Sequence, residues 1–232
     1  MVYTYSYPRP MVTVDIVVFR TNLGKGTVEL LLIERAGEPY ARFWALPGGF
    51  IEMEETLQTA AERELAEETG ITGLPLAFLE MADEPNRDPR GRTISAIFTA
   101  FAGPEILVKS GSDARNSGWF SPDSLPNLAF DHQTVVEGVL EQVRSRLLTD
   151  AWILEILPEY FELTDLQKAL QLWNLNGALA RTVVERLLEC GMVKTQSEGK
   201  YQRWYPSSLL NLPASNRLKL FLGRPLNQAA QK

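Results

Sequence analysis

Hydrophobic positions along the first half of the chain repeat with two periods, one typical of strands and one typical of helices. Two runs rich in β-branched and aromatic residues, 11–20 and 27–35, flank the turn sequence 22–26 and therefore predict a β-hairpin. Residues 54–69 carry apolar side chains every four positions and are followed by Gly70, which predicts a helix that ends at this glycine.

The same alternation continues towards the middle of the chain. Further strands are expected at 74–81 and 93–101, and a last short element is expected to start at Trp119. Residues 131–148 place apolar side chains at helical spacing and predict a second amphipathic helix. Strands that alternate with helices predict an α/β domain over residues 1–149.

The pattern changes after residue 149. Two short helices are expected at 164–173 and 178–190, and they are followed by two strand candidates at 192–196 and 201–205. Helix, turn, helix and β-hairpin in this order are typical of a winged helix. Residues 150–232 are therefore expected to form a small winged helix-turn-helix domain with a C-terminal tail.

Composition and charge narrow the class of protein. The 232 residues are 45% hydrophobic and 22% charged, which is typical of a globular chain. The single cysteine cannot form an internal disulfide, so we expect a reducing, cytoplasmic location. No apolar run reaches the ~18 residues of a membrane span, and the first ten residues do not resemble a signal peptide, so we expect no membrane partner. Residues 1–149 hold 13 Lys and Arg against 21 Asp and Glu, whereas residues 150–232 hold 10 against 8; this asymmetry suggests two modules with different partners.

Three carboxylates are crowded on the predicted helix 54–69. On a helix Glu64, Glu67 and Glu68 fall within one arc of about 100°, where like charges repel one another. A divalent ion would turn this repulsion into ligation, because Mg²⁺ prefers carboxylate oxygens and keeps waters and substrate phosphates in its shell. Gly48 and Gly49 precede the helix and would let the backbone approach a ligand closely.

These residues carry a family resemblance. The pattern G-x5-E-x7-R-E-U-x-E-E-x-G-U, with U aliphatic, is filled without departure by Gly49, Glu55, Arg63, Glu64, Leu65, Glu67, Glu68, Gly70 and Ile71. The segment resembles a Nudix box. The resemblance implies an α/β/α sandwich with a mixed sheet, and hydrolysis, dependent on Mg²⁺ or Mn²⁺, of a nucleoside diphosphate linked to another moiety.

The resemblance also implies roles for individual residues. Glu64, Glu67 and Glu68 would be metal ligands, and Arg63 would orient a box glutamate such as Glu55. One of the three glutamates, or a glutamate outside the box, would activate water, and the sequence does not say which.

A loop outside the box is rich in arginine. Residues 83–92 contain three Arg, and Arg90 and Arg92 are candidate substrate-binding residues together with Gly48 and Gly49, because guanidinium groups bind phosphates with paired hydrogen bonds. The alternative is a solvated loop with internal Arg–Asp pairs. The loop resembles that of Nudix proteins that act on or sense ADP-ribose.

Two further aromatic residues belong to stretches that resemble the same family. His132, the only histidine, follows 128–131, and we interpret it as a structural residue at a helix start rather than a catalytic one. Trp44 could stack on adenine, but its place in the stretch 43–49 favours a role in the core.

The order of the two predicted domains is similar to that of Nudix-related transcriptional regulators of NAD metabolism. This resemblance implies a homodimer that binds ADP-ribose and operator DNA. The candidate DNA-binding residues are Arg181, Arg186, Lys194, Lys200 and Arg203. The second helix of the winged-helix domain holds only two Arg, which are fewer cations than that group tends to show. This weakens the prediction of DNA binding, because phosphate contacts supply most of the non-specific affinity for DNA.

Two functions therefore stay open, and a third is weaker. The complete box favours a metal-dependent hydrolase of ADP-ribose or a similar compound. The domain order favours an ADP-ribose-sensing transcriptional regulator. Hydrolysis of oxidised nucleotides is disfavoured by the Arg-rich loop and the C-terminal module.

Overall fold

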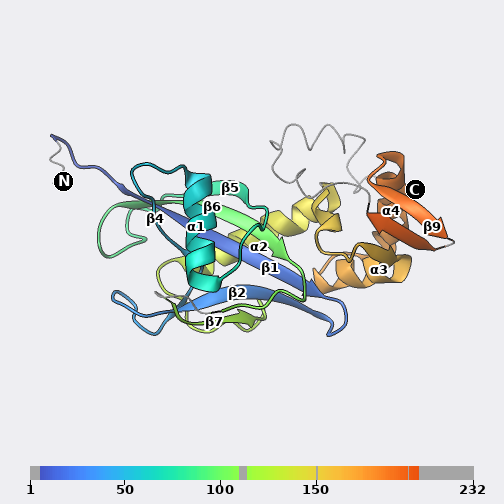
Figure 1. The fold of residues 1–232 in the computed structure, drawn as a ribbon, viewed down its shortest axis with the longest axis horizontal. Coiled ribbons are helices and arrows are strands. Elements are labelled where there is room, and N and C mark those ends of the chain that lie inside the picture. The colour runs from blue at the N-terminus through green and yellow to red at the C-terminus, as the bar shows by residue number, and fades with distance from the viewer. Residues whose placement is uncertain (1–5, 110–113, 150, 198, 204–232) are drawn as a thin grey trace. The chain divides into compact units, whose positions relative to one another are not determined.

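The computed structural model describes residues 6–109, 114–149, 151–197 and 199–203. In its first part the elements are β1 Met11–Asn22, β2 Thr27–Arg35, β3 Trp44–Ala45, β4 Gly48–Phe50, α1 Leu57–Thr69, β5 Ala77–Ala82, β6 Thr93–Ala102, β7 Ala114–Phe120 and α2 His132–Thr149. They are followed by the 3-10 helix η1 Ala151–Leu154, β8 Tyr160–Glu162, α3 Leu163–Leu172, the 3-10 helix η2 Gly177–Leu179, α4 Ala180–Glu189, β9 Val193–Ser197 and β10 Lys200–Arg203. Figure 1 shows this succession of strands and helices.

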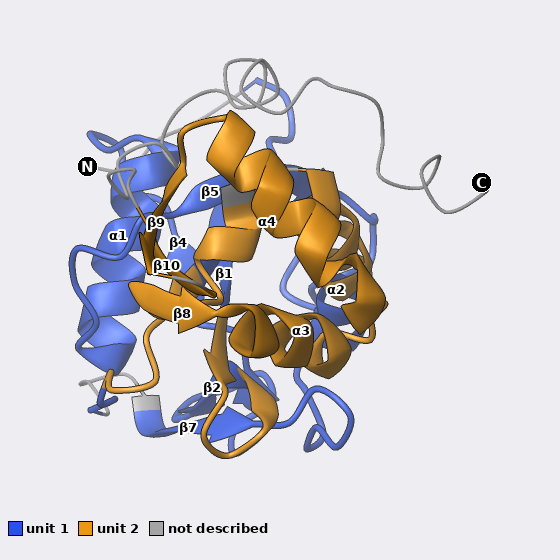
Figure 2. Ribbon diagram, turned by 90° about the vertical axis from the view of Figure 1, so that its right-hand side faces the viewer, with its two compact units in different colours: residues 1–18, 30–100, 107–137 blue, residues 19–29, 101–106, 138–232 orange. Residues whose placement is uncertain are grey.

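Seven strands form one sheet with the order β3-β2-β1-β6-β5, in which β4 pairs with β1 and β7 pairs with β2. Strands β1 and β6 are buried along most of their length, as strands covered on both faces are. Helix α1 and the first turns of α2 lie on opposite faces of the sheet (Figures 1 and 2). The predicted α/β/α sandwich with a mixed sheet is confirmed.

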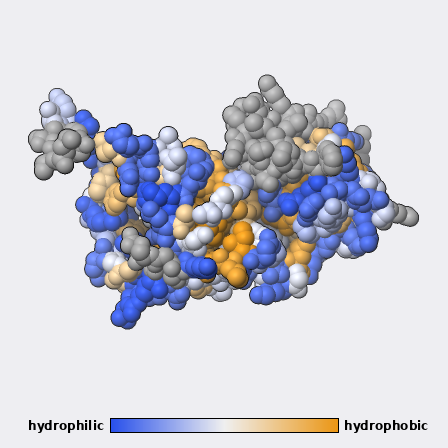
Figure 3. Space-filling view, in the orientation of Figure 1, coloured by the Kyte–Doolittle hydropathy of each residue, from blue (hydrophilic) through white to orange (hydrophobic). Residues whose placement is uncertain are grey.

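Helix α1 covers the sheet with a narrow apolar stripe. Ala60, Ala61 and Leu65 are buried on its inner side, whereas Glu62 is exposed. The visible face over α1 is accordingly mostly hydrophilic (Figure 3). The apolar period of the sequence therefore turns this stripe towards the sheet and leaves the glutamates of the helix outside the stripe.

The structure differs from the sequence prediction at three places in this part. Helix α1 begins at Leu57 and not at residue 54, because the Thr56 side chain caps it by accepting a hydrogen bond from Thr59 N. Trp119 belongs to the end of strand β7 and does not start an element. The short strands β3 and β4 were not predicted, because two or three residues are too few to display a period.

The C-terminal elements form the predicted winged helix. Helices α3 and α4 are joined through η2, and a three-stranded sheet has the order β8-β10-β9. Strand β8 was not predicted. The last strand was expected at 201–205; β10 ends at Arg203, and residues 204–205 and the C-terminal tail lie outside the described residues. No described helix is both long and apolar enough to cross a membrane.

The chain forms two compact units, which Figure 2 shows in separate colours. The first unit comprises Met1–Val18, Leu30–Ala100 and Leu107–Glu137, and the second comprises Phe19–Glu29, Phe101–Ile106 and Gly138–Lys232. The domain boundary between residues 149 and 150 stays a prediction.

The second unit is held together by an aromatic cluster. The Phe19 ring lies 5.2 Å from that of Trp173, and the Phe101 ring lies 5.6 Å from that of Trp152. The Trp173 indole N–H donates a buried hydrogen bond of 2.8 Å to Thr21 Oγ1. Residues from the first half of the sequence thus complete the core of the unit that carries the winged helix.

Candidate functional site

A cavity of about 760 Å³ opens in the first unit. Gly48 and Gly49 of β4 line it, together with Glu64 and Glu68 of α1 and Arg90 of the Arg-rich loop. Its volume lies within the range of small-molecule sites. Residues that are far apart in the sequence, the Nudix-like box and the Arg-rich loop, therefore meet around one cavity.

One wall of the cavity is acidic. Glu68 is only 8% exposed, and its Oε2 accepts a hydrogen bond of 2.9 Å from Gly48 N. Burial raises the pKa of the Glu64 carboxyl above its usual range. A Cβ atom on Gly49 would lie 2.3 Å from Glu64 Oε1, so a larger residue at this position would displace the Glu64 carboxylate.

Arg63 also lines the cavity, and it holds three glutamates of the box. Its guanidinium lies 2.7 Å from Glu55, 2.8 Å from Glu64 and 3.2 Å from Glu67, and it also donates to Phe50 O. The hydrogen bond to Glu55 raises the pKa of Arg63 and lowers that of Glu55. The expected pairing of Arg63 with Glu55 is confirmed. The Glu67 side chain is 57% exposed and lies outside the lining of the cavity.

The donor set of the acidic wall fits a divalent cation. Mg²⁺ is commonly held by one or two carboxylates together with waters and substrate phosphates, and Glu64 and Glu68 both line the cavity beside the Gly48 backbone. Within the described ranges no three His, Cys, Asp or Glu side chains are already grouped as a metal site. Glu64 and Glu67 instead form ion pairs with the Arg63 guanidinium.

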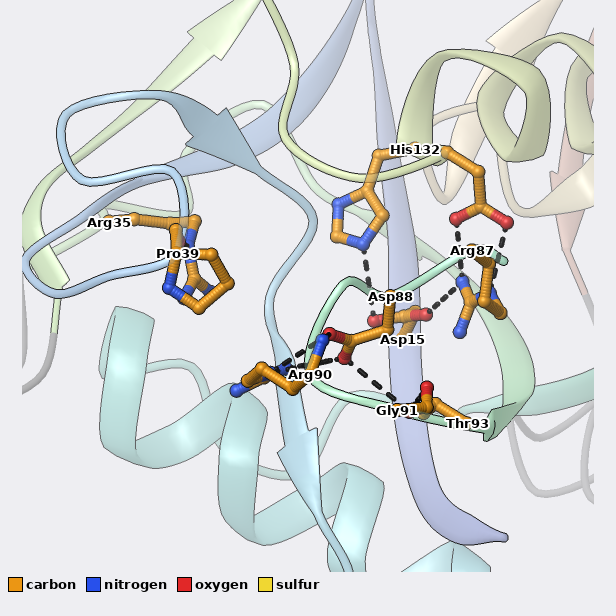
Figure 4. Close-up of polar contacts among 10 residues, drawn as sticks. Asp15, Arg35, Pro39, Arg87, Asp88, Arg90, Gly91, Thr93 and His132 are labelled. Atoms are coloured by element: carbon orange, nitrogen blue, oxygen red, sulfur yellow. Dashed lines mark hydrogen bonds and ion pairs between the residues drawn. The ribbon is translucent and has the colours of Figure 1, made fainter. Parts of the chain in front are cut away.

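Two arginines of the Arg-rich loop are engaged with carboxylates. Arg90 pairs with Asp88 through its Nε and Nη2 atoms, and its guanidinium stacks between the Phe50 and Phe130 rings at 4.9 and 5.4 Å. Arg87 is buried and pairs with Asp131 and Asp15 (Figure 4). Internal Arg–Asp pairs are therefore present, and Arg90 nevertheless lines the cavity. The third arginine of this loop, Arg92, donates to Asp83 O and does not line it.

Arg35, at the end of β2, was missed by the sequence analysis and lines the cavity. Its Nε donates to Pro39 O at 2.9 Å, and its guanidinium lies 4.8 Å from the centre of the Phe130 ring. Among the described residues no carboxylate lies within 4 Å of it. Burial and the neighbouring Arg90 charge lower the pKa of Arg35. An isolated arginine at a strand end has no sequence signal, because only the fold brings it to the cavity.

His132 lies at the start of α2 and is 4% exposed. Its Nδ1 accepts a hydrogen bond of 2.9 Å from Leu46 N, and its Nε2 faces Asp15 Oδ1 at 3.6 Å (Figure 4). Burial lowers the pKa of His132, which keeps the imidazole neutral. Trp44 does not line the cavity, and its ring packs edge to face against Phe120 at 4.5 Å.

The candidate DNA-binding residues lie on the winged helix of the second unit. Arg181 is exposed on α4, the exposed side of which also carries Glu185 and Glu189. Arg186 follows on α4, Lys194 is exposed on β9, Lys200 lies 3.7 Å from Glu162, and Arg203 donates to Leu154 O at 2.8 Å. The charge on the exposed side of α4 is thus close to balanced.

A family model describing the NUDIX domain matches residues 9–139. This match covers more than half of the chain, and the protein therefore belongs to the Nudix family.

Two relatives share different extents of the chain. The ADPR responsive transcriptional repressor NtrR of Acinetobacter baylyi is 28% identical over 208 residues, which cover 88% of this chain and 82% of that protein. The ADP-ribose pyrophosphatase of Methanocaldococcus jannaschii is 39% identical over 132 residues, which cover 56% of this chain and 73% of that protein. Among solved structures, Shewanella oneidensis NrtR complexed with a 27mer DNA has a TM-score of 0.71 and 24% identity, covering 86% of this chain and 95% of that one; it shares the fold.

Proposed function

We propose that the protein is a Mg²⁺-dependent hydrolase that cleaves the diphosphate of ADP-ribose or a similar nucleoside diphosphate derivative. One observation carries the proposal: a single cavity is lined both by the Glu64 and Glu68 carboxylates and by the Arg35 and Arg90 guanidinium groups. The likeness of the first part of the chain to an ADP-ribose pyrophosphatase supports the same substrate class.

Opposite charges around one cavity suit a diphosphate that is bound together with a cation. Glu64 and Glu68 would hold the cation, which would neutralise the diphosphate and lower the pKa of an attacking water. Arg35 also lines the cavity and is half-buried, so it would donate hydrogen bonds to phosphate oxygens where burial strengthens charged contacts. Water adds to one phosphorus, the bridging P–O bond breaks, and a glutamate takes the proton of the water, so that ADP-ribose yields AMP and ribose 5-phosphate.

The experiment compares two variants of the same helix. Glu68→Gln removes a carboxylate charge from the cavity, whereas the control Glu62→Gln removes one from the exposed side of α1, where Glu62 contacts Gln58. AMP release from ADP-ribose in Mg²⁺ is expected at roughly 1 s⁻¹ or more for the wild type and the control, and to fall at least 100-fold in Glu68→Gln. Equal turnover in all three proteins would exclude the proposed role of Glu68. A parallel titration with Mn²⁺ decides which ion supports the faster reaction.

A second candidate function is an ADP-ribose-responsive transcriptional regulator that acts as a homodimer on operator DNA. The observation that favours it is the likeness to a transcriptional repressor along 88% of the chain, beyond the Nudix domain and through the winged helix. A dimer would double the phosphate contacts of a winged helix that has few cations. Both candidate functions agree with the cytoplasmic location expected from the single cysteine.

The regulator is tested with promoter DNA of an NAD-synthesis gene. Binding is expected to weaken with salt, to weaken in Arg181→Ala but not in the control Arg115→Ala on β7 of the first unit, and to be relieved by ADP-ribose. Equal affinity for random DNA would count against a regulator. Binding of ADP-ribose without AMP release would favour the regulator over the hydrolase.

A further inference from the structure

A chain of mostly buried polar groups lines part of the cavity, and the proposed hydrolysis does not use it. Asp131, at the start of α2, accepts hydrogen bonds of 2.9 and 2.8 Å from Arg87, and Arg87 donates to Asp15 on β1 at 3.1 Å. Asp15 faces His132, and His132 accepts from Leu46 N (Figure 4). Four segments of the first unit are joined in this way: the start of α2, the Arg-rich loop, strand β1, and the turn between β3 and β4.

The tautomer of His132 follows from its two neighbours. Nδ1 accepts the Leu46 N–H, so the proton of the neutral ring belongs on Nε2, which faces the Asp15 carboxylate. Both ring nitrogens are therefore directed at protein groups. This arrangement favours a role for His132 through the hydrogen bond that its Nδ1 accepts, rather than a direct contact with the reacting atoms.

The backbone N–H that His132 holds belongs to Leu46, two residues before Gly48, which bonds to Glu68 in the acidic wall. Leu46 is 2% exposed, and its N–H would be buried without a partner if Nδ1 were removed. Pro47 O accepts from Ile16 N, and Gly48 N donates to Glu68 Oε2. Three successive residues thus bond to α2, β1 and α1, and the first of these bonds is the one made by His132.

We propose that His132 is a positioning residue that fixes the turn Leu46–Gly48, so that Gly48 N–H holds the Glu68 carboxylate in the orientation that binds the cation. The inference rests on the proposed function, because it assumes that the Glu68 carboxylate binds the cation. Groups that orient a metal ligand through a hydrogen bond typically change metal affinity or activity by about 10- to 100-fold when they are lost.

The position of an acceptor atom, rather than the volume of the side chain, is what the proposal requires. His132→Asn keeps an acceptor close to Nδ1, and His132→Gln moves the acceptor towards Nε2. His132→Phe keeps a ring of similar size without any acceptor. If one variant does not fold, the comparison between the other variants and the wild type still tests the position of the acceptor.

Two readouts are measured on folded protein well below its unfolding temperature. The dissociation constant of Mn²⁺ is obtained from the electron paramagnetic resonance signal of the free ion, and kcat and KM are obtained for ADP-ribose. We expect Phe and Gln at position 132 to raise the Mn²⁺ dissociation constant about tenfold and to lower kcat, with KM changed less than about twofold, and we expect Asn to restore both values.

A merely structural role predicts a different result. It lowers the unfolding temperature of the variants but leaves the Mn²⁺ dissociation constant per folded molecule unchanged, and this outcome, or equal constants for Asn and Gln, overturns the proposal. The Mn²⁺ measurement does not depend on turnover. A wild type that binds Mn²⁺ without releasing AMP therefore overturns the hydrolase, while the comparison at His132 still decides the positioning role.

Discussion

At the scale of single residues, the guanidinium of Arg35 is the charge in the cavity that protein groups neutralise least. Arg90 is paired with Asp88, and Arg63 with three glutamates, whereas Arg35 is held by Pro39 O and the Phe130 ring. A cation that is oriented without being neutralised keeps its remaining N–H groups for a ligand. It is therefore the residue from which we expect the largest contribution to anion binding.

This argument predicts the effect of Arg35→Gln. A hydrogen bond to a charged group contributes about 1.5–3 kcal/mol, so KM for ADP-ribose is expected to rise about 10- to 100-fold, with a smaller change in kcat. Arg42→Gln is the matched control, because it removes the same charge from an exposed side chain in the loop that follows β2. Steady-state kinetics of the three proteins check the prediction, and equal KM values for both variants would contradict it.

The buried histidine predicts how stability depends on pH. Burial lowers the pKa of His132 in the folded protein, so near and below pH 6.5 the unfolded chain binds a proton that the folded protein does not. Stability is therefore complete well above that pH and is lost as the pH falls through the unfolded value, with a slope of at most about 1.36 kcal/mol per pH unit.

The single histidine makes this slope measurable. Because the chain has no other His, urea unfolding of the wild type and of His132→Asn between about pH 5.5 and 7.5 isolates its contribution. The wild type is expected to lose stability relative to the variant towards acid pH. Parallel curves for the two proteins would contradict the prediction, because they would mean that His132 binds its proton over the same pH range in the folded protein as in the unfolded chain.

The sequence analysis identified those residues of the site that lie close together in the chain. The helical period places Glu64 and Glu68 on one face of a helix, and the structure has both in the cavity. The period cannot show that Arg63 holds Glu67 away from the lining, because this depends on rotamers. Arg35 enters the site through strand pairing, which no local pattern reveals.

At the scale of elements, the start of α1 depends on a local cap. Thr56 Oγ1 accepts from Thr59 N at 3.2 Å, and Thr56 N donates to Thr59 Oγ1 at 2.8 Å. The reciprocal pair replaces the Glu or Gln that commonly closes such a cap. The acidic residues before Thr56 therefore belong to the preceding turn, although their composition suits a helix.

Thr56→Ala tests this cap. Loss of an N-cap hydroxyl typically costs about 1 kcal/mol, so the free energy of unfolding is expected to fall by about that amount. ADP-ribose turnover should stay close to the wild-type value, because Thr56 does not line the cavity. The control is Gln58→Ala, which removes only an exposed contact to Glu62 and should cost about 0.2–0.5 kcal/mol. A larger loss in the control would show that the exposed contact, and not the cap, stabilises the start of α1.

Elements with a clear period were predicted well, and those without one were missed. The hairpin of β1 and β2 and the two long helices follow the apolar spacing, with ends that shift by a few residues. Strands β3, β4 and β8 have two or three residues each, and their place is decided by the partner strand rather than by their own sequence.

At the scale of the whole molecule, the aromatic cluster of the second unit joins segments that the sequence pattern assigned to different domains. Phe19 and Phe101 come from β1 and β6, whereas Trp152 and Trp173 come from the region after residue 149. Trp152 and Trp173 are 0% and 1% exposed. The hydrophobic pattern places Phe19 and Phe101 in predicted strands and Trp173 in a predicted helix, but it cannot say which side chains pack together.

A separated C-terminal piece tests what this cluster contributes. Residues 150–232 alone would lack both phenylalanines and the Thr21 hydroxyl that accepts from Trp173. Because burying one large apolar side chain contributes about 1.5–3 kcal/mol, and a small domain has only a few kcal/mol to lose, we expect this piece to show solvent-exposed tryptophan fluorescence and no cooperative thermal transition.

The full chain supplies the control for the separated piece. Phe19→Ala and Phe101→Ala are each expected to lower the free energy of unfolding by about 3–5 kcal/mol, whereas Phe78→Ala on β5, whose side chain is 50% exposed, should cost much less. If residues 150–232 instead unfold cooperatively near the temperature of the full chain, the winged helix folds independently. The boundary between residues 149 and 150 then separates two folding units. If they do not, the strands of the Nudix sheet are part of the folding unit that carries the winged helix, and any effect of ADP-ribose on DNA binding has to be studied in the whole chain.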